Sequence, residues 1–265
     1  MKPGEFFELL WSDYLDHAPS AQGIHRLLGG GAAIVNDHIA LRTFASPSLG
    51  LEALHPLFTG MGFEIGDEYR FAAKKLAARY YRHPDESVPK IFISELLLDE
   101  CSADLHDAVL ALCEGVSGDA VNSPAFLASG RHWSLDYATY RSLLAESEYA
   151  AWLAAHGFCA NHFTVSVNAL PGFESVAAVN QALKQAGYRL NTSGGEIKGS
   201  PQVLLEQSST LADPVRVAFS DGEHSIPGCF YEFAYRYPQQ DGSLYQGFVE
   251  ANADRIFEST NSRAG

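Results

Sequence analysis

The sequence has few cysteines, few basic residues and no long apolar run. Its four cysteines (Cys101, Cys113, Cys159 and Cys229) form no CxxC pair, which argues against a structural zinc site and is typical of a cytosolic chain with buried free thiols. Acidic residues outnumber basic ones by 32 to 18, giving a net charge of −14, so neither a nucleic acid nor an anionic membrane is the expected partner. No stretch approaches the roughly 18 apolar residues of a membrane span. We therefore expect a cytoplasmic protein whose partner is a small molecule.

The sequence does contain an apolar strand that carries two strongly polar side chains. Residues 35–44, VNDHIALRTF, alternate between two faces when read as a strand. One face carries Ile39, Leu41 and Thr43, and the other carries His38, Ala40, Arg42 and Phe44. Because burying an imidazole and a guanidinium without partners is costly, this face is expected to line a polar cavity.

One pattern of elements occurs twice in the chain. Residues 35–98 and 158–240 each predict a strand, an amphipathic helix and three further strands, which in the second unit cover 194–200, 203–219 and 229–237. The remaining segments are N-terminal helices over 1–34, a helical insertion over 99–157, and a C-terminal helix and tail over 241–265. The pattern predicts a single α+β domain in which two βαβββ units form an open, barrel-like cavity. The first and fourth strands of each unit line it.

The two units carry histidines and carboxylates that suggest a metal site. His38 and His162 lie on the first strands, and we align Glu95 with Glu232 on the fourth strands. Two histidines and one carboxylate are typical of iron(II) with open positions for substrate and dioxygen. Glu232 lies within FYEFAY, where an unpaired carboxylate is disfavoured. Glu95 is interpreted as a hydrogen-bond partner of a ligand histidine or as a water-facing residue, with a fourth ligand as the alternative.

Further polar residues are candidates for substrate binding. Arg42 lies on the metal face and favours carboxylate recognition over a structural ion pair, because a guanidinium binds a carboxylate through two hydrogen bonds. Lys198 and Ser200, in SGGEIKGSP, lie either in a plain hairpin or in a substrate site. His132 and Trp133 are interpreted as packing residues, and His224 as a solvated loop residue.

Several segments together resemble one known family. They are VNDHIALRTF, NHFTVSVN with TSGGEIKGSP, FYEFAYR and YQGFVEANADRIFEST. They resemble the DUF1338 family, the 2-oxoadipate dioxygenase/decarboxylase group of the vicinal oxygen chelate superfamily. The resemblance implies a non-haem Fe(2+) enzyme of lysine catabolism, which converts 2-oxoadipate and dioxygen to 2-hydroxyglutarate and carbon dioxide.

The resemblance also implies roles for particular residues. The family's metal ligands fall on His38, His162 and Glu232, and its catalytic, substrate-binding arginine falls on Arg42. Longer members have a Val-Ser pair beside the substrate where this chain has Val249 and Glu250. Val249 is therefore expected to bind substrate. A dicarboxylate substrate requires the Glu250 carboxylate to point away.

Two other functions fit the same residues. One is a redox-neutral isomerase or hydrolase of glyoxalase type, which would use zinc or nickel and recruit Glu95 as a fourth ligand. The other is a non-catalytic protein that sequesters a small ligand. A homo-oligomer is compatible with the sequence.

Overall fold

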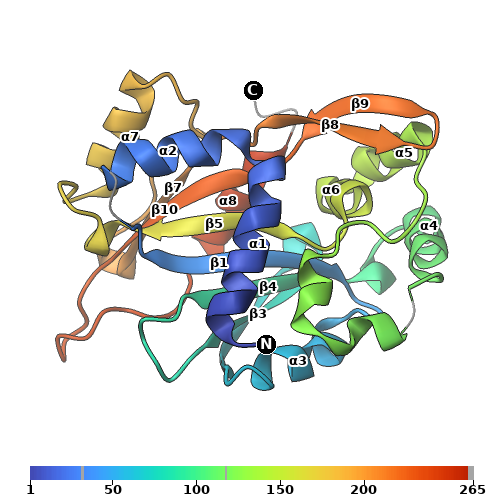
Figure 1. Ribbon diagram of the computed structural model, residues 1–265, viewed down its shortest axis with the longest axis horizontal. Helices are drawn as coiled ribbons and strands as arrows, with labels where there is room; N and C mark the ends of the chain where they lie inside the picture. Colours follow the sequence, from blue (N-terminus) through green and yellow to red (C-terminus); the bar gives the residue numbers. More distant parts are fainter. Residues whose placement is uncertain (31–32, 117, 262–265) are drawn as a thin grey trace.

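The computed structural model describes residues 1–30, 33–116 and 118–261 (Figure 1). The end of the expected C-terminal tail, 262–265, lies outside this range. Two helices, α1 (Pro3–His17) and α2 (Pro19–Gly29), begin the chain. Helix α1 buries Phe6, Leu10 and Tyr14. These residues are four apart, so they line one face of a helix.

An eight-stranded sheet forms the centre of the molecule. The first unit contains β1 (Asn36–Phe44), α3 (Leu51–Thr59), β2 (Glu64–Phe71), β3 (Leu76–Arg82) and β4 (Lys90–Leu96). The second contains β5 (Ala160–Ser166), α7 (Val176–Gln185), β6 (Lys198–Ser200), β7 (Leu205–Ser209) and β10 (Phe230–Arg236). The strand order is β2-β3-β4-β1-β5-β10-β7-β6.

The sheet order shows that the two units are equivalent. Each unit pairs its first strand in parallel with its last, β1 with β4 and β5 with β10, and the units join where β1 meets β5 antiparallel. The curled sheet of two βαβββ units confirms the predicted α+β fold class.

Helices between the two units pack at one end of the sheet (Figure 1). They are α4 (Ala103–Cys113), α5 (Tyr137–Glu146) and α6 (Glu148–His156). Every residue of α6 from Tyr149 to His156 is buried, and the helix contacts β1. The Trp133 indole donates a hydrogen bond to the Ala154 carbonyl, and His132 stacks on Phe126, in agreement with the packing role predicted for both.

One strand prediction in the second unit is wrong. Residues 214–219 form β8 (Pro214–Phe219), which pairs with β9 (Gly222–Pro227) in a separate two-stranded sheet. The two-residue turn is Ser220-Asp221, and Gly222 pairs with Phe219 as the first residue of β9. His224 lies on β9 and stacks on Tyr137 with ring centroids 3.6 Å apart, so it is not a solvated loop residue.

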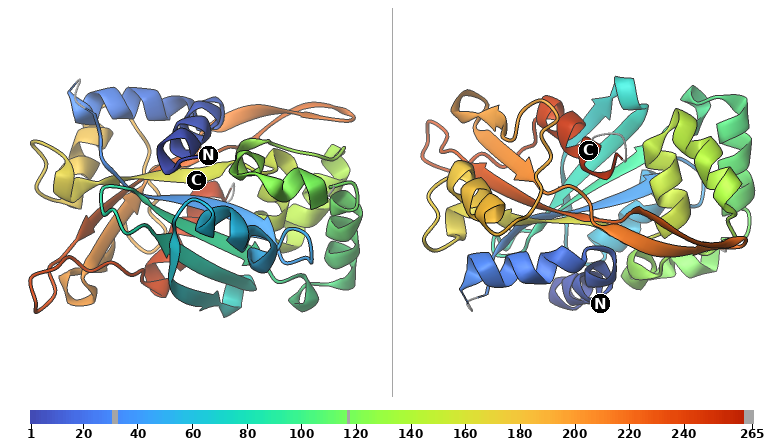
Figure 2. Two further views of the ribbon diagram at one scale, coloured as in Figure 1. Left: turned by 60° about the horizontal axis from the view of Figure 1, so that its bottom comes forward. Right: turned by 90° about the horizontal axis from the view of Figure 1, so that it is seen from above.

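The C-terminal helix closes the open side of the sheet. Helix α8 (Glu250–Ile256) and the following 3₁₀ turn η7 (Phe257–Thr260) lie on the face opposite α1 and α2 (Figure 2). Helix α8 contacts β2 and β6, the two edge strands, so it bridges the mouth of the curled sheet. Within the described part of the chain, no helix combines the length and apolarity that crossing a bilayer requires.

Candidate metal centre

Three buried side chains converge from three adjacent strands. His38 comes from β1, His162 from β5 and Glu232 from β10, and one ligand atom of each lies within 4.8 Å of the others. The Nε2 atom of His162 is 3.0 Å from Glu232 Oε2, and the Nε2 atom of His38 is 3.7 Å from Glu232 Oε1. The sheet brings together residues that are up to 194 positions apart, because β1, β5 and β10 are neighbours.

The geometry of Glu232 fits a divalent cation. Its Oε1 atom accepts a hydrogen bond from Gln207 Nε2 at 2.6 Å. Its Oε2 atom is buried and accepts no hydrogen bond from any described residue, although His162 Nε2 is only 3.0 Å away. A buried carboxylate oxygen without a donor is unfavourable. A cation bound by Glu232 Oε2 and His162 Nε2 would remove this cost, so His38, His162 and Glu232 are suited to hold a metal.

Neighbouring residues orient both imidazoles. The Nδ1 atom of His38 is 2.8 Å from Asp37 Oδ1, and that of His162 is 3.0 Å from Asn161 Oδ1. Arg236 in turn donates two hydrogen bonds to the Asp37 carboxylate, at 2.6 and 2.9 Å. These contacts occupy Nδ1 and leave Nε2 facing the cluster, as is usual for metal-binding histidines.

Sequence analysis did not identify these orienting residues. The signal was present, since an acid or amide directly precedes the histidine in both units, as Asp37-His38 and Asn161-His162. The role of Arg236 could not be read from the sequence, because it pairs with an acid 199 residues away.

The protonation states also suit a metal site. Burial would raise the pKa of the Asp37 carboxyl, but Arg236 and His38 hold it well below its usual range. Burial likewise acts to raise the pKa of Glu232, which the two histidines nevertheless lower. Burial lowers the pKa of His162. A neutral imidazole and an ionised carboxylate are the forms that bind metals.

Glu95 lies outside this cluster, so its alignment with Glu232 is wrong. In the parallel pairings, His38 lies opposite Lys90 and His162 lies opposite Phe230. The residue that matches Glu232 is therefore Phe92, three positions before Glu95. Glu95 instead accepts a hydrogen bond from the Leu51 backbone N–H at 2.8 Å, at the start of α3.

A small, mostly apolar cavity adjoins the three candidate ligands. Its volume is about 20 Å³, which is enough for roughly one water molecule. Besides the ligands it is lined by Phe92, Gln207, Phe248, Ala253, Ile256 and Phe257. The last four belong to the C-terminal segment, so α8 and the residues beside it cover the site.

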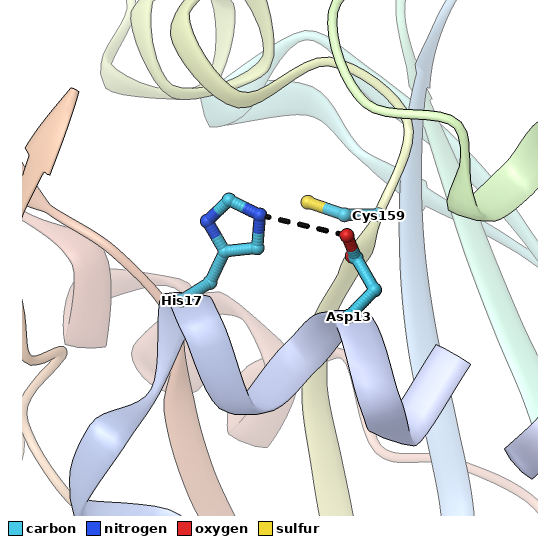
Figure 3. Close-up of side chains that lie close together, drawn as sticks. All are labelled: Asp13, His17 and Cys159. Carbon is cyan, nitrogen blue, oxygen red and sulfur yellow. Dashed lines mark ion pairs between the residues drawn. The ribbon is translucent and has the colours of Figure 1, made fainter. Parts of the chain in front are cut away.

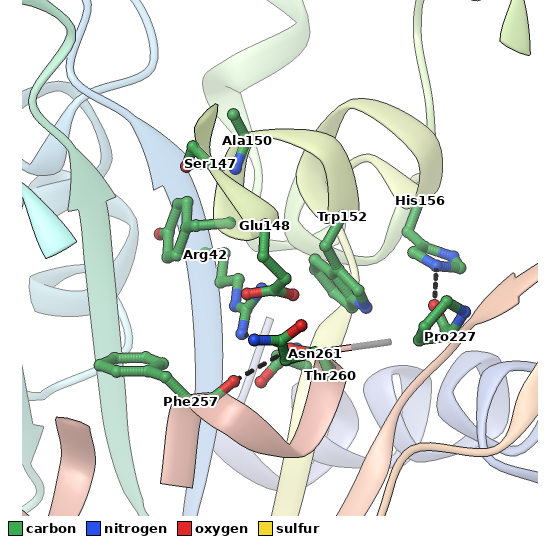
Figure 4. Close-up of polar contacts among 12 residues, drawn as sticks. Arg42, Ser147, Glu148, Ala150, Trp152, His156, Pro227, Phe257, Thr260 and Asn261 are labelled. Atoms are coloured by element: carbon green, nitrogen blue, oxygen red, sulfur yellow. Dashed lines mark hydrogen bonds and ion pairs between the residues drawn. The ribbon is translucent and has the colours of Figure 1, made fainter. Parts of the chain in front are cut away.

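Arg42 lies beyond this cavity, in an aromatic cage. Figure 4 shows its side chain between α6 and the C-terminal turn. The guanidinium carbon is 4.7 Å from the ring centre of Tyr149, 4.8 Å from that of Trp152 and 5.8 Å from that of Phe257. One nitrogen donates to Glu148 at 3.3 Å and another to Thr260 Oγ1 at 3.1 Å. Nε has no acceptor among the residues that the structure describes, so the guanidinium retains hydrogen-bonding capacity.

Comparison with known proteins shows to which family the chain belongs. The model of the family described as 2-oxoadipate dioxygenase/decarboxylase matches residues 13–117 and 123–242, which include all three candidate ligands. The chain belongs to this family. A rice (Oryza sativa) protein named 2-oxoadipate dioxygenase/decarboxylase is 37% identical, over 94% of this chain and 76% of the relative. The chain is thus an enzyme of the dioxygenase/decarboxylase type.

Solved structures support the same assignment. Rice hydroxyglutarate synthase in complex with 2-oxoadipate is 33% identical with a TM-score of 0.90, over 98% of this chain and 92% of that one. A Shewanella frigidimarina protein, provisionally described as a hydrolase, is 56% identical with a TM-score of 0.91, over 94% and 98%. A Ralstonia eutropha protein, provisionally placed in the glyoxalase superfamily, has the same fold at 23% identity and a TM-score of 0.77, over 92% and 84%. This likeness shows that the two proteins share one fold, which is consistent with the vicinal oxygen chelate-like fold expected from the sequence.

The other predicted substrate-binding residues of this 2-oxoadipate dioxygenase/decarboxylase family member do not line the cavity; they are Lys198, Ser200 and Val249. Lys198 on β6 is buried opposite Gln207, and its Nζ atom donates to the Asn191 carbonyl at 2.5 Å. Ser200 is half-buried, two residues further along β6. Val249 is half-buried just before α8, and the exposed Glu250 carboxylate lies 3.5 Å from the backbone nitrogen of Arg70.

The Glu95→Ala variant tests whether Glu95 stabilises the fold or binds the metal. Because Glu95 accepts a hydrogen bond from the first turn of α3, its loss should lower the free energy of unfolding by about 1 kcal/mol. The metal stoichiometry should stay unchanged. Denaturant unfolding and metal analysis measure the two quantities, with Glu232→Ala as the matched control that should lose the metal. Loss of metal from Glu95→Ala would contradict the placement.

Proposed function

We propose that the protein is an iron(II) enzyme that converts 2-oxoadipate and dioxygen to 2-hydroxyglutarate and carbon dioxide. The observation that carries this proposal is the buried cluster of two imidazoles and one carboxylate, with a carboxylate oxygen that lacks a donor among the described residues. This ligand set is typical of non-haem iron(II) oxygenases. The rice relative that was solved with 2-oxoadipate supports the substrate.

Iron would be held by His38, His162 and Glu232, and when bound it would supply the reaction with dioxygen. The surrounding residues would orient the substrate and exclude water. Phe92, Phe248 and Phe257 form apolar walls that keep bulk water from the reacting centre. The stoichiometry balances, since the carboxylate carbon beside the keto group leaves as carbon dioxide, one atom of dioxygen converts the keto carbon to a carboxylate, and the other becomes the hydroxyl oxygen of the five-carbon product.

Arg42 would bind the distal carboxylate, and this requires the C-terminal segment to move. A cavity of about 20 Å³ cannot hold a six-carbon dicarboxylate. Phe257 lines that cavity and also lies against the Arg42 guanidinium, while Thr260 accepts one of its hydrogen bonds. Displacement of η7 would therefore enlarge the cavity and release Arg42 for the substrate. The carboxylate would replace the 3.3 Å contact with Glu148.

The proposal is tested by oxygen consumption. The protein would be purified without oxygen, loaded with iron(II), and mixed with 2-oxo dicarboxylic acids of five, six and seven carbons in an oxygen electrode. We expect consumption to be greatest with 2-oxoadipate, with equimolar release of carbon dioxide and 2-hydroxyglutarate. Turnover of no 2-oxo acid by iron-loaded protein would refute the proposal.

Arg42→Ala should weaken 2-oxo acid binding. Loss of a guanidinium–carboxylate contact removes about 1.5–3 kcal/mol, so the KM should rise by roughly tenfold to a hundredfold. Iron binding should persist, because Arg42 is not one of the converging ligands. Steady-state kinetics would measure the change, with Arg216→Ala on exposed β8 as the control. An unchanged KM would remove Arg42 from the substrate site.

Lys198 should make substrate affinity depend on pH. Burial lowers the pKa of its ammonium group to about 8, so the group is charged below that pH and neutral above it. If Lys198 attracts the dianionic substrate, the KM should rise as the pH passes about 8. The Lys198→Met variant should show no such rise. Equal pH profiles for the two proteins would leave Lys198 with a structural role only.

A redox-neutral hydrolase remains the second candidate, because the Shewanella frigidimarina relative carries that provisional description. Such an enzyme on this scaffold was expected to use a fourth ligand. The equivalent position holds Phe92, whose side chain cannot bind a metal. This observation favours the oxygenase, whose substrate and dioxygen need open positions.

A further inference from the structure

A second group of metal-ligating side chains lies on the opposite face of the sheet. Asp13 and His17 are four residues apart on α1 and so project from one face of the helix. Cys159 directly precedes β5. One ligand atom of each residue lies within 4.8 Å of the others, and Figure 3 shows the three side chains pointing toward a common point.

These side chains converge without satisfying one another. The His17 Nε2 atom is 3.9 Å from Asp13 Oδ1, too far for a hydrogen bond. The Asp13 Oδ2 atom is buried and meets no donor within residues 1–30, 33–116 and 118–261. The Cys159 thiol makes a long, weak contact of 3.9 Å with the Gly157 carbonyl, and its other neighbour is the buried thiol of Cys229. A buried oxygen beside an imidazole and a thiol is the arrangement that a cation would complete.

We propose that Asp13, His17 and Cys159 form a second metal site, which binds a zinc ion. One thiolate, one imidazole and one carboxylate are all ligands that zinc accepts. Bonds of about 2.0–2.3 Å in tetrahedral geometry place ligand atoms about 3.3–3.8 Å apart, so small side-chain rotations would suffice. The side chains of His17 and Asp13 are 23% and 27% exposed, which leaves the fourth position to water.

A metal explains this cluster better than a nucleophilic cysteine does. Cysteine, histidine and aspartate also occur together in hydrolases, where the thiol attacks a substrate. Cys159, however, is only 2% exposed, so a substrate carbonyl could not reach its sulfur. The absence of CxxC pairs led to the prediction that the chain has no structural zinc site. The convergence of the single Cys159 with Asp13 and His17 is the observation that departs from that prediction.

The ion would fasten the N-terminal helix to the strand that carries His162. Cys159 is three residues before His162, and Asp13 and His17 belong to α1. The ring of His156 packs edge-on against His17, with centroids 5.2 Å apart, and its Nε2 contacts the Pro227 carbonyl at 2.8 Å. This packing holds the His17 ring in place. Because the ion would bind only the folded chain, it would stabilise the fold by mass action.

Cobalt(II) offers a probe that distinguishes the two metal sites. A thiolate bound to cobalt gives a charge-transfer band in the near ultraviolet, and the cluster of His38, His162 and Glu232 contains no thiol. We expect the band when wild-type protein is titrated with cobalt without oxygen, and its loss when zinc is added. Cys159→Ser should lack the band. Cys101→Ser, which removes a half-buried thiol elsewhere, should keep it.

Two further measurements distinguish loss of the second metal site from misfolding of a variant. Cys159→Ser should still bind one cobalt ion at the His38 cluster, which would show that its fold is intact. His17→Gln, at a partly exposed position, should weaken cobalt binding at the thiolate site by about tenfold or more. A wild-type protein without the band, or a band that persists in Cys159→Ser, would overturn the proposal.

Discussion

Replacing His162 with alanine should abolish both iron binding and oxygen consumption. His162 supplies one of three converging ligand atoms, and its Nε2 lies 3.0 Å from Glu232 Oε2. Changes to residues that merely orient a ligand already weaken metal binding by about 10- to 100-fold, so loss of the ligand should cost at least about 100-fold. Iron analysis after anaerobic loading and the oxygen electrode would measure the two effects.

The matched control for this variant is His132→Ala. His132 is an exposed histidine that stacks on Phe126, away from the cluster. It should bind iron and consume oxygen as the wild type does. If His162→Ala retained activity, the assignment of the metal centre would fail. If both variants lost activity, the effect would reflect general destabilisation rather than loss of a ligand.

Phe92→Glu should retain the metal and lose the reaction with dioxygen. Phe92 occupies the position in the first unit that Glu232 occupies in the second, and it lines the cavity. A carboxylate there would fill a coordination position that substrate or dioxygen needs. We expect one iron ion per chain and oxygen consumption at background level. Metal should also raise the unfolding temperature of this variant more than that of the wild type, because it would neutralise a buried charge.

Phe92→Leu is the control, since it keeps an apolar wall and adds no ligand. It should consume oxygen at a rate within a few-fold of the wild type. Wild-type oxygen consumption by Phe92→Glu would show that the fourth strand of the first unit does not face the metal. The two variants therefore test whether a second carboxylate ligand, added at position 92, prevents the oxygenase reaction, as expected if redox-neutral enzymes on this scaffold use four ligands.

The duplicated pattern was enough to predict the fold class and to single out the converging side chains. Strand periodicity identified β1 and β5, and the matching histidines pointed to one site. The same argument matched Glu95 with Glu232 as equivalent positions. It considered only that each acid lies on a fourth strand, without knowing the pairing register between β4 and β1. Pairing between β4 and β1 is fixed by side-chain packing along the whole sheet, which a single sequence does not display.

Other features could not be predicted from the sequence, for different physical reasons. The ion pair between Asp37 and Arg236 depends on the approach of β10 to β1 across β5. Arg42 was placed on the metal face by strand alternation, yet it is caged by Tyr149 and Trp152 from a helix of the insertion. The β8–β9 hairpin turns at Ser220-Asp221, directly after residues 214–219, which were predicted as part of a strand of the main sheet.

The central claim is that one iron ion is bound jointly by His38, His162 and Glu232. Crystals of anaerobically iron-loaded protein, measured on both sides of the iron absorption edge, would test it directly. The account predicts one iron-specific anomalous peak between the Nε2 atoms of the two histidines and the Glu232 carboxylate. A peak elsewhere, or none in crystals of protein that retains iron, would contradict it.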